Sequence, residues 1–223
     1  MKKTIKSVLL SALLLAGVSA HAELVHTDWK VDGDSLATLD VDTGIEWLKL
    51  TETAGRSYNT VSGQLGSDFL GWRLPSESEF QTLLVKMYPS IGNIATNSYV
   101  GVVESDYLFW RDAFGSSATD GSVVRSFGWY MSDVGTLHYG GNDVNYIHGN
   151  DPYVANGFID SGHANYAVFL VSDGGVTLSS INNPLLNANN PNAPEIVEDV
   201  YAPLGLGVLS LVMLGFRTRR QWR

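Results

Sequence analysis

The stretch Gly71-Trp72-Arg73-Leu74-Pro75-Ser76-Glu77-Ser78-Glu79-Phe80 is the junction from which the rest of the chain can be interpreted. Its proline disfavours a helical conformation in the residue before it, so an extended segment ends there. Ser76 and Glu79 have the spacing of a capping box, in which each side chain satisfies a backbone N–H at a helix start. Apolar residues then follow at i, i+3, i+4 and i+7, namely Phe80, Leu83, Leu84 and Met87. The sequence therefore predicts a strand over Gly71–Leu74 and a helix over Ser76–Tyr88.

Turn residues and hydrophobic periodicity define further elements on both sides of this junction. The expected elements are β structure over Glu23–Leu50 with a turn at Asp42-Thr43-Gly44, helices over Ser57–Leu65 and Ser105–Phe114, and a strand over Val123–Met131. Ser132–Gly162 is dominated by Gly, Asn and Asp, and we expect a long insertion there with short strands at best. Asn165–Val171 and Val176–Ser179 flank Asp173-Gly174-Gly175, which predicts a β-hairpin.

Composition limits the classes of function. The chain of 223 residues has room for one domain with appendages, and its 10 Tyr and 6 Trp favour an ordered core. It has no cysteine, which excludes disulfides, thiolate metal sites and cysteine nucleophiles. All 23 acidic residues lie between Glu23 and Asp199, a region that carries a net charge of −16. Such a surface repels nucleic acid, so we expect no nucleic-acid partner.

Both ends of the chain have the pattern of export and membrane segments. Residues 1–22 combine three lysines, an apolar run and an Ala20-His21-Ala22 end, which predicts a secretory signal peptide cleaved before Glu23. Residues 181–199 are rich in Asn and Pro and are expected to be a linker. Residues 200–223 begin with the uncharged run Val200–Phe216 and end in arginines. This predicts a transmembrane helix that stops in the inner membrane, at least transiently, with its basic end in the cytoplasm.

The tail also resembles a PEP-CTERM sorting signal, in which a short motif precedes an apolar helix and an arginine-rich terminus. The residues that carry the resemblance are Ala202, Pro203, Arg217, Arg219 and Arg220. Ala202-Pro203 stands where the family has Pro-Glu-Pro, so this chain departs from the usual motif. The resemblance implies an exosortase as a partner and a final location at the cell surface or in the extracellular matrix.

A second resemblance covers residues from about Asp40 to Ser179. The segments Asp42-Thr43-Gly44-Ile45-Glu46-Trp47, Gly71-Trp72-Arg73-Leu74-Pro75-Ser76 with Glu79-Phe80, and Gly128-Trp129-Tyr130-Met131-Ser132 resemble the Lcl C-terminal-domain family. The structural motif residues that it implies are Asp42, Gly44, Trp47, Trp72, Arg73, Pro75, Ser76 and Glu79. It implies a single α+β domain, over residues 23–180, related to the C-type-lectin-like and formylglycine-generating-enzyme-like folds. Arg73 is expected to lie among aromatic or acidic groups, as an architectural residue rather than a ligand-binding one.

Candidate chemistry outside these motifs is sparse. Asp143, Asp151 and Asp160 offer the hard oxygen ligands that calcium prefers, and calcium is the one cofactor that we consider. His138, His148 and His163 share no metal-binding spacing and are expected to be surface histidines. An aromatic surface for glycans is a further hypothesis, with core packing as the alternative, and its candidates are Trp129, Tyr139, Tyr146 and Tyr153.

We therefore expect an exported bacterial protein with a binding or structural role, tethered to the membrane or sorted to the surface. Its expected ligand is matrix polysaccharide or another surface protein. The alternative is a glycan-acting hydrolase with paired carboxylates. The sequence contains no G-x-S-x-G nucleophile motif, phosphate-binding loop or dinucleotide-binding fingerprint, so it predicts no catalytic residue.

Overall fold

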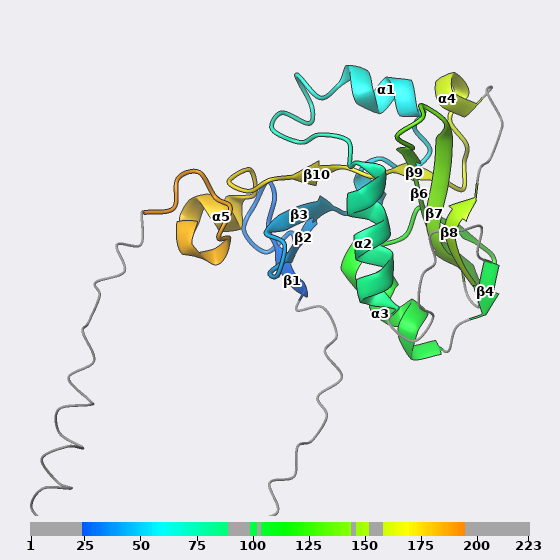
Figure 1. Ribbon diagram of the computed structural model, residues 1–223, viewed down its shortest axis with the longest axis horizontal. Helices are drawn as coiled ribbons and strands as arrows, with labels where there is room; N and C mark the ends of the chain where they lie inside the picture. The colour runs from blue at the N-terminus through cyan, green and yellow to red at the C-terminus, as the bar shows by residue number, and fades with distance from the viewer. Residues whose placement is uncertain (1–23, 89–98, 102–103, 144–145, 152–157, 195–223) are drawn as a thin grey trace, which may run out of the picture. The chain divides into compact units, whose positions relative to one another are not determined.

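The computed structural model describes residues 24–88, 99–101, 104–143, 146–151 and 158–194 (Figure 1). The chain divides into two units at Ala193/Pro194, and the fold described here is that of the first unit. Both helices and strands contribute to it, so the domain is α+β, as the sequence predicted. The predicted signal peptide, the predicted transmembrane run Val200–Phe216 and the proposed sorting residues lie outside the described residues. None of the described helices is long and apolar enough to cross a bilayer.

The smaller of two sheets is built from the first strands of the chain and one late strand. Its order is β1-β2-β3-β10, and all three pairings are antiparallel. The strands are β1 (Leu24–Thr27), β2 (Ala37–Asp40), β3 (Ile45–Leu48) and β10 (Val171–Ser172). The predicted turn Asp42-Thr43-Gly44 connects β2 to β3, and Gly44 has a φ of +70°. Positive φ is costly for residues with a Cβ, which explains the glycine in this turn.

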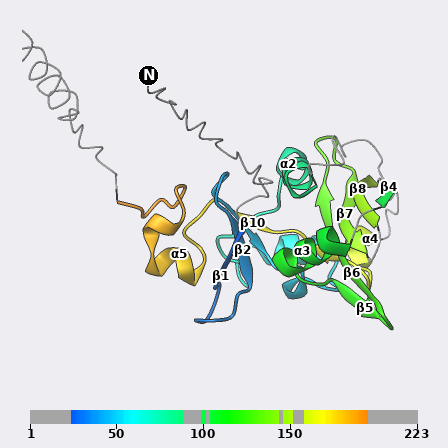
Figure 2. The same cartoon turned by 90° about the horizontal axis from the view of Figure 1, so that it is seen from below.

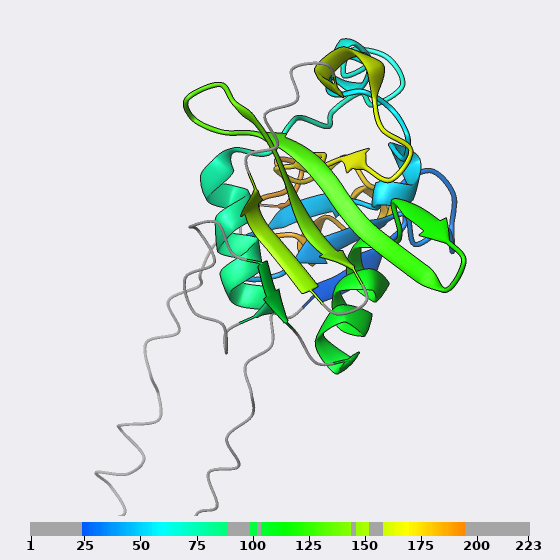
Figure 3. The same cartoon turned by 90° about the vertical axis from the view of Figure 1, so that its right-hand side faces the viewer.

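The larger sheet has the order β4-β8-β7-β6-β5, and β9 pairs parallel to β6 (Figure 3). The strands are β4 (Tyr99–Gly101), β5 (Ala118–Asp120), β6 (Val123–Met131), β7 (Leu137–Asp143), β8 (Tyr146–Asp151) and β9 (Ala167–Val168). The predicted strand Val123–Met131 is confirmed as β6. The prediction for Ser132–Gly162 was wrong in one respect, because β7 and β8 are full strands beside β6.

A short 3-10 helix, η1 (Leu50–Glu52), follows β3. The described part of the fold has five α-helices: α1 (Tyr58–Gly63), α2 (Glu77–Met87), α3 (Glu104–Phe114), α4 (Phe158–Ser161) and α5 (Leu178–Asn182). The predictions of α1, α2 and α3 are confirmed to within a few residues at each end. Ser76 caps α2, and both hydrogen bonds of the capping box are present. Helix α3 contacts β2 of the smaller sheet as well as β6 and β7 of the larger one (Figure 2).

Aromatic side chains fill the space between α2, α3 and the sheets. Phe80 of α2 stacks on Tyr130 of β6 with ring centroids 4.4 Å apart. Trp47 of β3 meets Phe169 edge-on, with centroids 6.0 Å apart. Gly140 of β7 lies under the Phe80 ring, where a Cβ would collide with the ring. Gly140 therefore allows close packing of β7 against α2.

The predicted hairpin between Asn165–Val171 and Val176–Ser179 is wrong. Val171 and Ser172 form β10, which pairs with β3, while Leu178 and Ser179 begin α5. The predicted strand Gly71–Leu74 is reduced to one bridge, in which Arg73 and Val171 exchange two backbone hydrogen bonds of 2.8 Å. The late strand thus closes the smaller sheet against the Trp-Arg-Leu-Pro segment instead of pairing with its own sequence neighbour.

The domain also extends beyond the predicted boundary at residue 180. Residues 184–186 form a 3-10 turn, and the side chains of Asn187 and Asn190 are 1% and 4% exposed. Residues 181–193, which we predicted as linker, belong to the same unit as the sheets. An Asn-rich composition favours loops, and here the amide side chains fasten such a loop to the domain.

Candidate ligand-binding pocket

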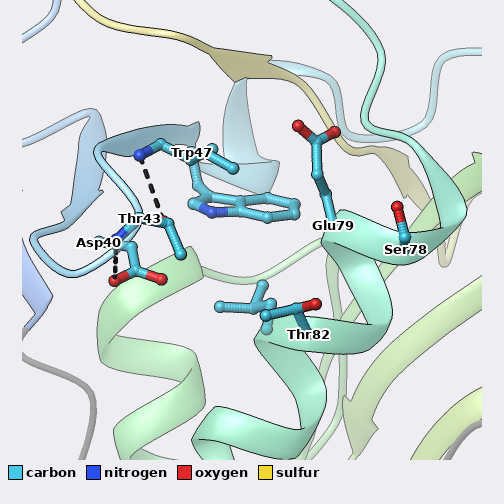
Figure 4. Close-up of a pocket in the computed structure, with 8 residues that line it drawn as sticks. Asp40, Thr43, Trp47, Ser78, Glu79 and Thr82 are labelled. Carbon is cyan, nitrogen blue, oxygen red and sulfur yellow. Dashed lines mark hydrogen bonds between the residues drawn. The ribbon is translucent and has the colours of Figure 1, made fainter. Parts of the chain in front are cut away.

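The two sequence motifs meet at one pocket between the β2–β3 turn and α2 (Figure 4). We call it the turn–helix pocket, and its volume is about 220 Å³. Its lining residues are Asp40, Thr43, Ile45, Trp47, Ser78, Glu79, Thr82 and Leu83. The first four come from the end of β2, the turn and β3, and the last four come from α2. The Asp-Thr-Gly and Trp-Arg-Leu-Pro segments are therefore neighbours in space.

The floor of the turn–helix pocket is apolar. Trp47 and Leu83 are 1% and 2% exposed, and Trp47 stands between the turn and α2 in Figure 4. The hydroxyl-bearing residues Ser78 and Thr82 are exposed on α2 at i and i+4, so they share one face of the helix. An apolar floor with a few polar groups at its edge is the usual construction of a small-molecule site.

One end of the pocket is held by an ion cluster centred on Lys86. Its ammonium binds Asp40, whose side chain is 3% exposed, and Asp42 at 2.7 Å. Burial by itself lowers the pKa of Lys86. The hydrogen bonds and charge interactions with the two carboxylates together outweigh burial, so the pKa of Lys86 lies above its usual value. Asp40 also accepts hydrogen bonds from the backbone N–H groups of Asp42 at 3.1 Å and Thr43 at 3.4 Å. This carboxylate therefore fixes the turn and a cation at once.

The other end is held by Arg73. Its guanidinium donates to Glu79 at 2.9 Å and 2.6 Å, and its Nε donates to Asp173 Oδ2 at 3.0 Å, with a further contact to Asp173 Oδ1. The Arg73 hydrogen bond is the largest cause that lowers the pKa of Glu79. Glu79 also accepts from the backbone N–H of Ser76 at 2.8 Å, as the capping box requires. Arg73 thus joins the start of α2 to the residue after β10.

The remaining motif residues have architectural positions. Trp72 is 3% exposed, and it meets Trp29 edge-on with centroids 5.7 Å apart. Pro75 is buried directly before the N-cap residue Ser76. Neither Trp72 nor Pro75 lines the pocket, so the structure brings together only part of the motif set.

The three calcium candidates lie on three different elements. Asp143 ends β7, Asp151 ends β8, and Asp160 lies in α4, where it accepts from Asn59 Nδ2 at 2.6 Å. Within the described ranges, no group of three or more His, Asp or Glu side chains gathers as a metal site would require. Calcium binding stays a prediction.

Two predictions about aromatic and histidine side chains need correction. Trp129 and Tyr139 are 0% and 7% exposed, so they pack the core and cannot form a glycan-binding surface. Tyr146 is partly exposed, and Tyr153 lies outside the described residues.

His138 and His148 are buried rather than exposed, and the ring centroids of His148 and Tyr139 are 5.5 Å apart. Aromatic neighbours on adjacent strands enclose them, which their sequence spacing did not reveal.

Sequence reasoning missed several residues of the pocket and of the ion pairs at its two ends. Ser78, Thr82 and Lys86 recur at i, i+4 and i+8, so the sequence contained a signal that they share a helical face. Asp40 and Asp173 had no such signal, because their partners lie 46 and 100 residues away. Comparison of the chain with protein-family models, curated proteins and solved structures finds no match, so the site is interpreted from its geometry alone.

Proposed function

We propose that this chain is an exported binding protein whose turn–helix pocket takes a neutral, polyhydroxylated ligand, such as a saccharide unit of a matrix polysaccharide. The observation that carries the proposal is the pocket itself: an apolar Trp47 floor with Ser78 and Thr82 hydroxyls and two carboxylates at its edge. Carboxylates accept strong hydrogen bonds from hydroxyl groups, and an apolar floor with a few polar groups at its edge is the usual construction of a small-molecule site.

Charge favours a neutral ligand over an anionic one. The region from Glu23 to Asp199 carries a net charge of −16, which repels anions at a distance. The two cations near the pocket, Lys86 and Arg73, are already paired with carboxylates. An anionic ligand would therefore have to displace an existing ion pair.

The same ion pairs weigh against the alternative, a glycan-acting hydrolase. Glycoside hydrolysis needs one carboxylic acid with a raised pKa to protonate the leaving oxygen. Arg73 lowers the pKa of Glu79 instead, and Asp40 is engaged by Lys86 and two backbone N–H groups. Neither carboxylate of the pocket has the environment of a general acid.

The fold family and the location form the rest of the proposal. We propose a relation to the C-type-lectin-like fold of the Lcl C-terminal-domain family, which the convergence of the two motifs on one pocket supports. We also propose that residues 1–22 direct export and that residues 200–223 anchor the chain or sort it in the PEP-CTERM manner. The charge pattern of the two ends supports this, with exosortase as the expected partner.

The test is a titration of the purified protein with neutral hexasaccharides of defined linkage (cellohexaose, laminarihexaose and hexa-N-acetylchitohexaose) by calorimetry. Thr82→Tyr fills the pocket and should abolish binding of any hexaose that the original protein binds. Thr119→Tyr, at an exposed position of β5, is the matched control and should bind normally. Binding that survives Thr82→Tyr would place the ligand elsewhere, and release of reducing ends during the titration would favour the hydrolase.

A further inference from the structure

The segment Asn187–Asn190, which we call the Asn strap, lies against the turn that forms one side of the pocket. Asn187 is 1% exposed and Asn190 is 4% exposed. The Asn190 Nδ2 donates to the Ser180 carbonyl at 2.8 Å, and its backbone N–H donates to the Asn187 carbonyl at 3.0 Å. The strap is therefore hydrogen-bonded to α5 and also contains an internal hydrogen bond.

Two strap amides bind the backbone of the turn directly. Asn187 Nδ2 donates to the Gly44 carbonyl at 2.9 Å, and Asn189 Nδ2 donates to the Thr43 carbonyl at 2.7 Å. A Cβ at Gly44 would collide with the Asn189 amide, so the strap and the turn are in close contact. The strap reaches this turn from a position more than 140 residues later in the chain.

The turn is consequently held from two sides. On the pocket side, Asp40 accepts from the backbone N–H groups of Asp42 and Thr43 and binds Lys86. On the other side, the strap holds the carbonyls of Thr43 and Gly44. Thr43 lines the pocket, so the position of its side chain depends on both sets of hydrogen bonds.

We infer that Asn187 and Asn189 are positioning residues for the turn–helix pocket, so that ligand affinity depends on an intact strap. This inference rests on the proposed function of the pocket. It also makes binding sensitive to where the C-terminal region is cut. Cleavage near Ala202-Pro203 would leave the strap in place, whereas cleavage before Asn187 would detach it from the turn.

The test uses Asn189→Asp in the full chain, because this change keeps the size of the side chain and removes the donor to Thr43. Asn192→Asp is the matched control, since it makes the same charge change at an exposed position. The backbone N–H of Asn192 donates to Asn190 Oδ1, and this hydrogen bond does not involve the side chain that is changed. Hydrogen exchange of the peptide spanning Asp40–Trp47 is measured together with affinity for whichever of the three hexaoses binds. We expect exchange of that peptide to rise and affinity to fall, each on the order of tenfold, the equivalent of one lost hydrogen bond.

Three outcomes would overturn the inference. Unchanged exchange would mean that the strap does not hold the turn. Faster exchange with unchanged affinity would make the strap a structural brace only. Equal effects of Asn189→Asp and Asn192→Asp would point to charge rather than to the lost donor. If the original protein binds no hexaose, the proposed function fails for these ligands, and the dependence of affinity on the strap fails with it. The exchange measurement still decides whether the strap holds the turn.

Discussion

The two ion pairs of Arg73 should differ in strength, because the same guanidinium meets one sheltered and one exposed carboxylate. Both pairs are bidentate, so exposure is what separates them, and the Glu79 side chain is 21% exposed. The Asp173 side chain is 70% exposed. Bidentate charge-assisted pairs are worth about 1.5–3 kcal/mol when sheltered, and exposed pairs about 0.2–1 kcal/mol. The Arg73 side chain is itself 37% exposed, so we take the low end for both.

We therefore predict a coupling free energy of about 1.5 kcal/mol for Arg73–Glu79 and at most about 0.5 kcal/mol for Arg73–Asp173. The assay is a pair of double-mutant cycles by urea unfolding, with Arg73→Met, Glu79→Gln and Asp173→Asn. Glutamine retains an oxygen that can accept from the Ser76 N–H, so the capping box is preserved in the cycle.

Equal coupling energies, or a larger value for Asp173, would refute the reasoning that burial decides the strength of these pairs. The same cycles repeated in high salt provide a control. The Asp173 coupling should fall more than the Glu79 coupling, because salt screens exposed charges more effectively.

Three further predictions concern pH, the turn and the tail. Because the folded-state pKa of Glu79 is lowered, its contribution to stability is complete above its usual value of 4.5 and is lost as pH falls through the folded value. Urea unfolding should therefore show stability falling below about pH 4.5, with a shallower slope in Glu79→Gln. Gly44→Ala should lower stability by about 1 kcal/mol more than Gly55→Ala. Gly55 has a similar φ of +72° and open space around it, whereas a Cβ at Gly44 would displace the Asn189 amide and break its hydrogen bond to the Thr43 carbonyl. Deleting residues 200–223 should move the protein from the membrane or surface fraction to the soluble fraction, and equal solubility of both forms would contradict the role proposed for this tail.

Local sequence determined the helices α1, α2 and α3 and the tight turn. The capping box of Ser76 and Glu79 depends on residues three positions apart, and the apolar face of α2 depends on spacings of three and four. The turn at Gly44 needs a residue that tolerates positive φ. These interactions are complete within a few residues, so a sequence pattern is sufficient to predict them.

Tertiary structure alone decided the strands β7 and β8, the partner of β10 and the pocket. Gly140 belongs to the stretch predicted as an insertion with short strands at best, yet it lies in the full strand β7, where Phe80 of α2 occupies the space that a side chain would fill. Val171 pairs with Trp47 rather than with a nearby segment, which no local pattern specifies.

The pocket likewise depends partly on features visible in the sequence and partly on contacts that only the tertiary structure makes. The motif residues Trp47 and Glu79 were visible in the sequence, but their convergence was not, because η1, α1 and a loop separate them in the chain. The Asn strap gave an even more misleading signal, since an asparagine-rich segment flanked by prolines is typical of an unattached linker. Its amides instead satisfy the carbonyls of a turn that lies more than 140 residues earlier in the chain, and only the folded chain brings those groups within hydrogen-bonding distance.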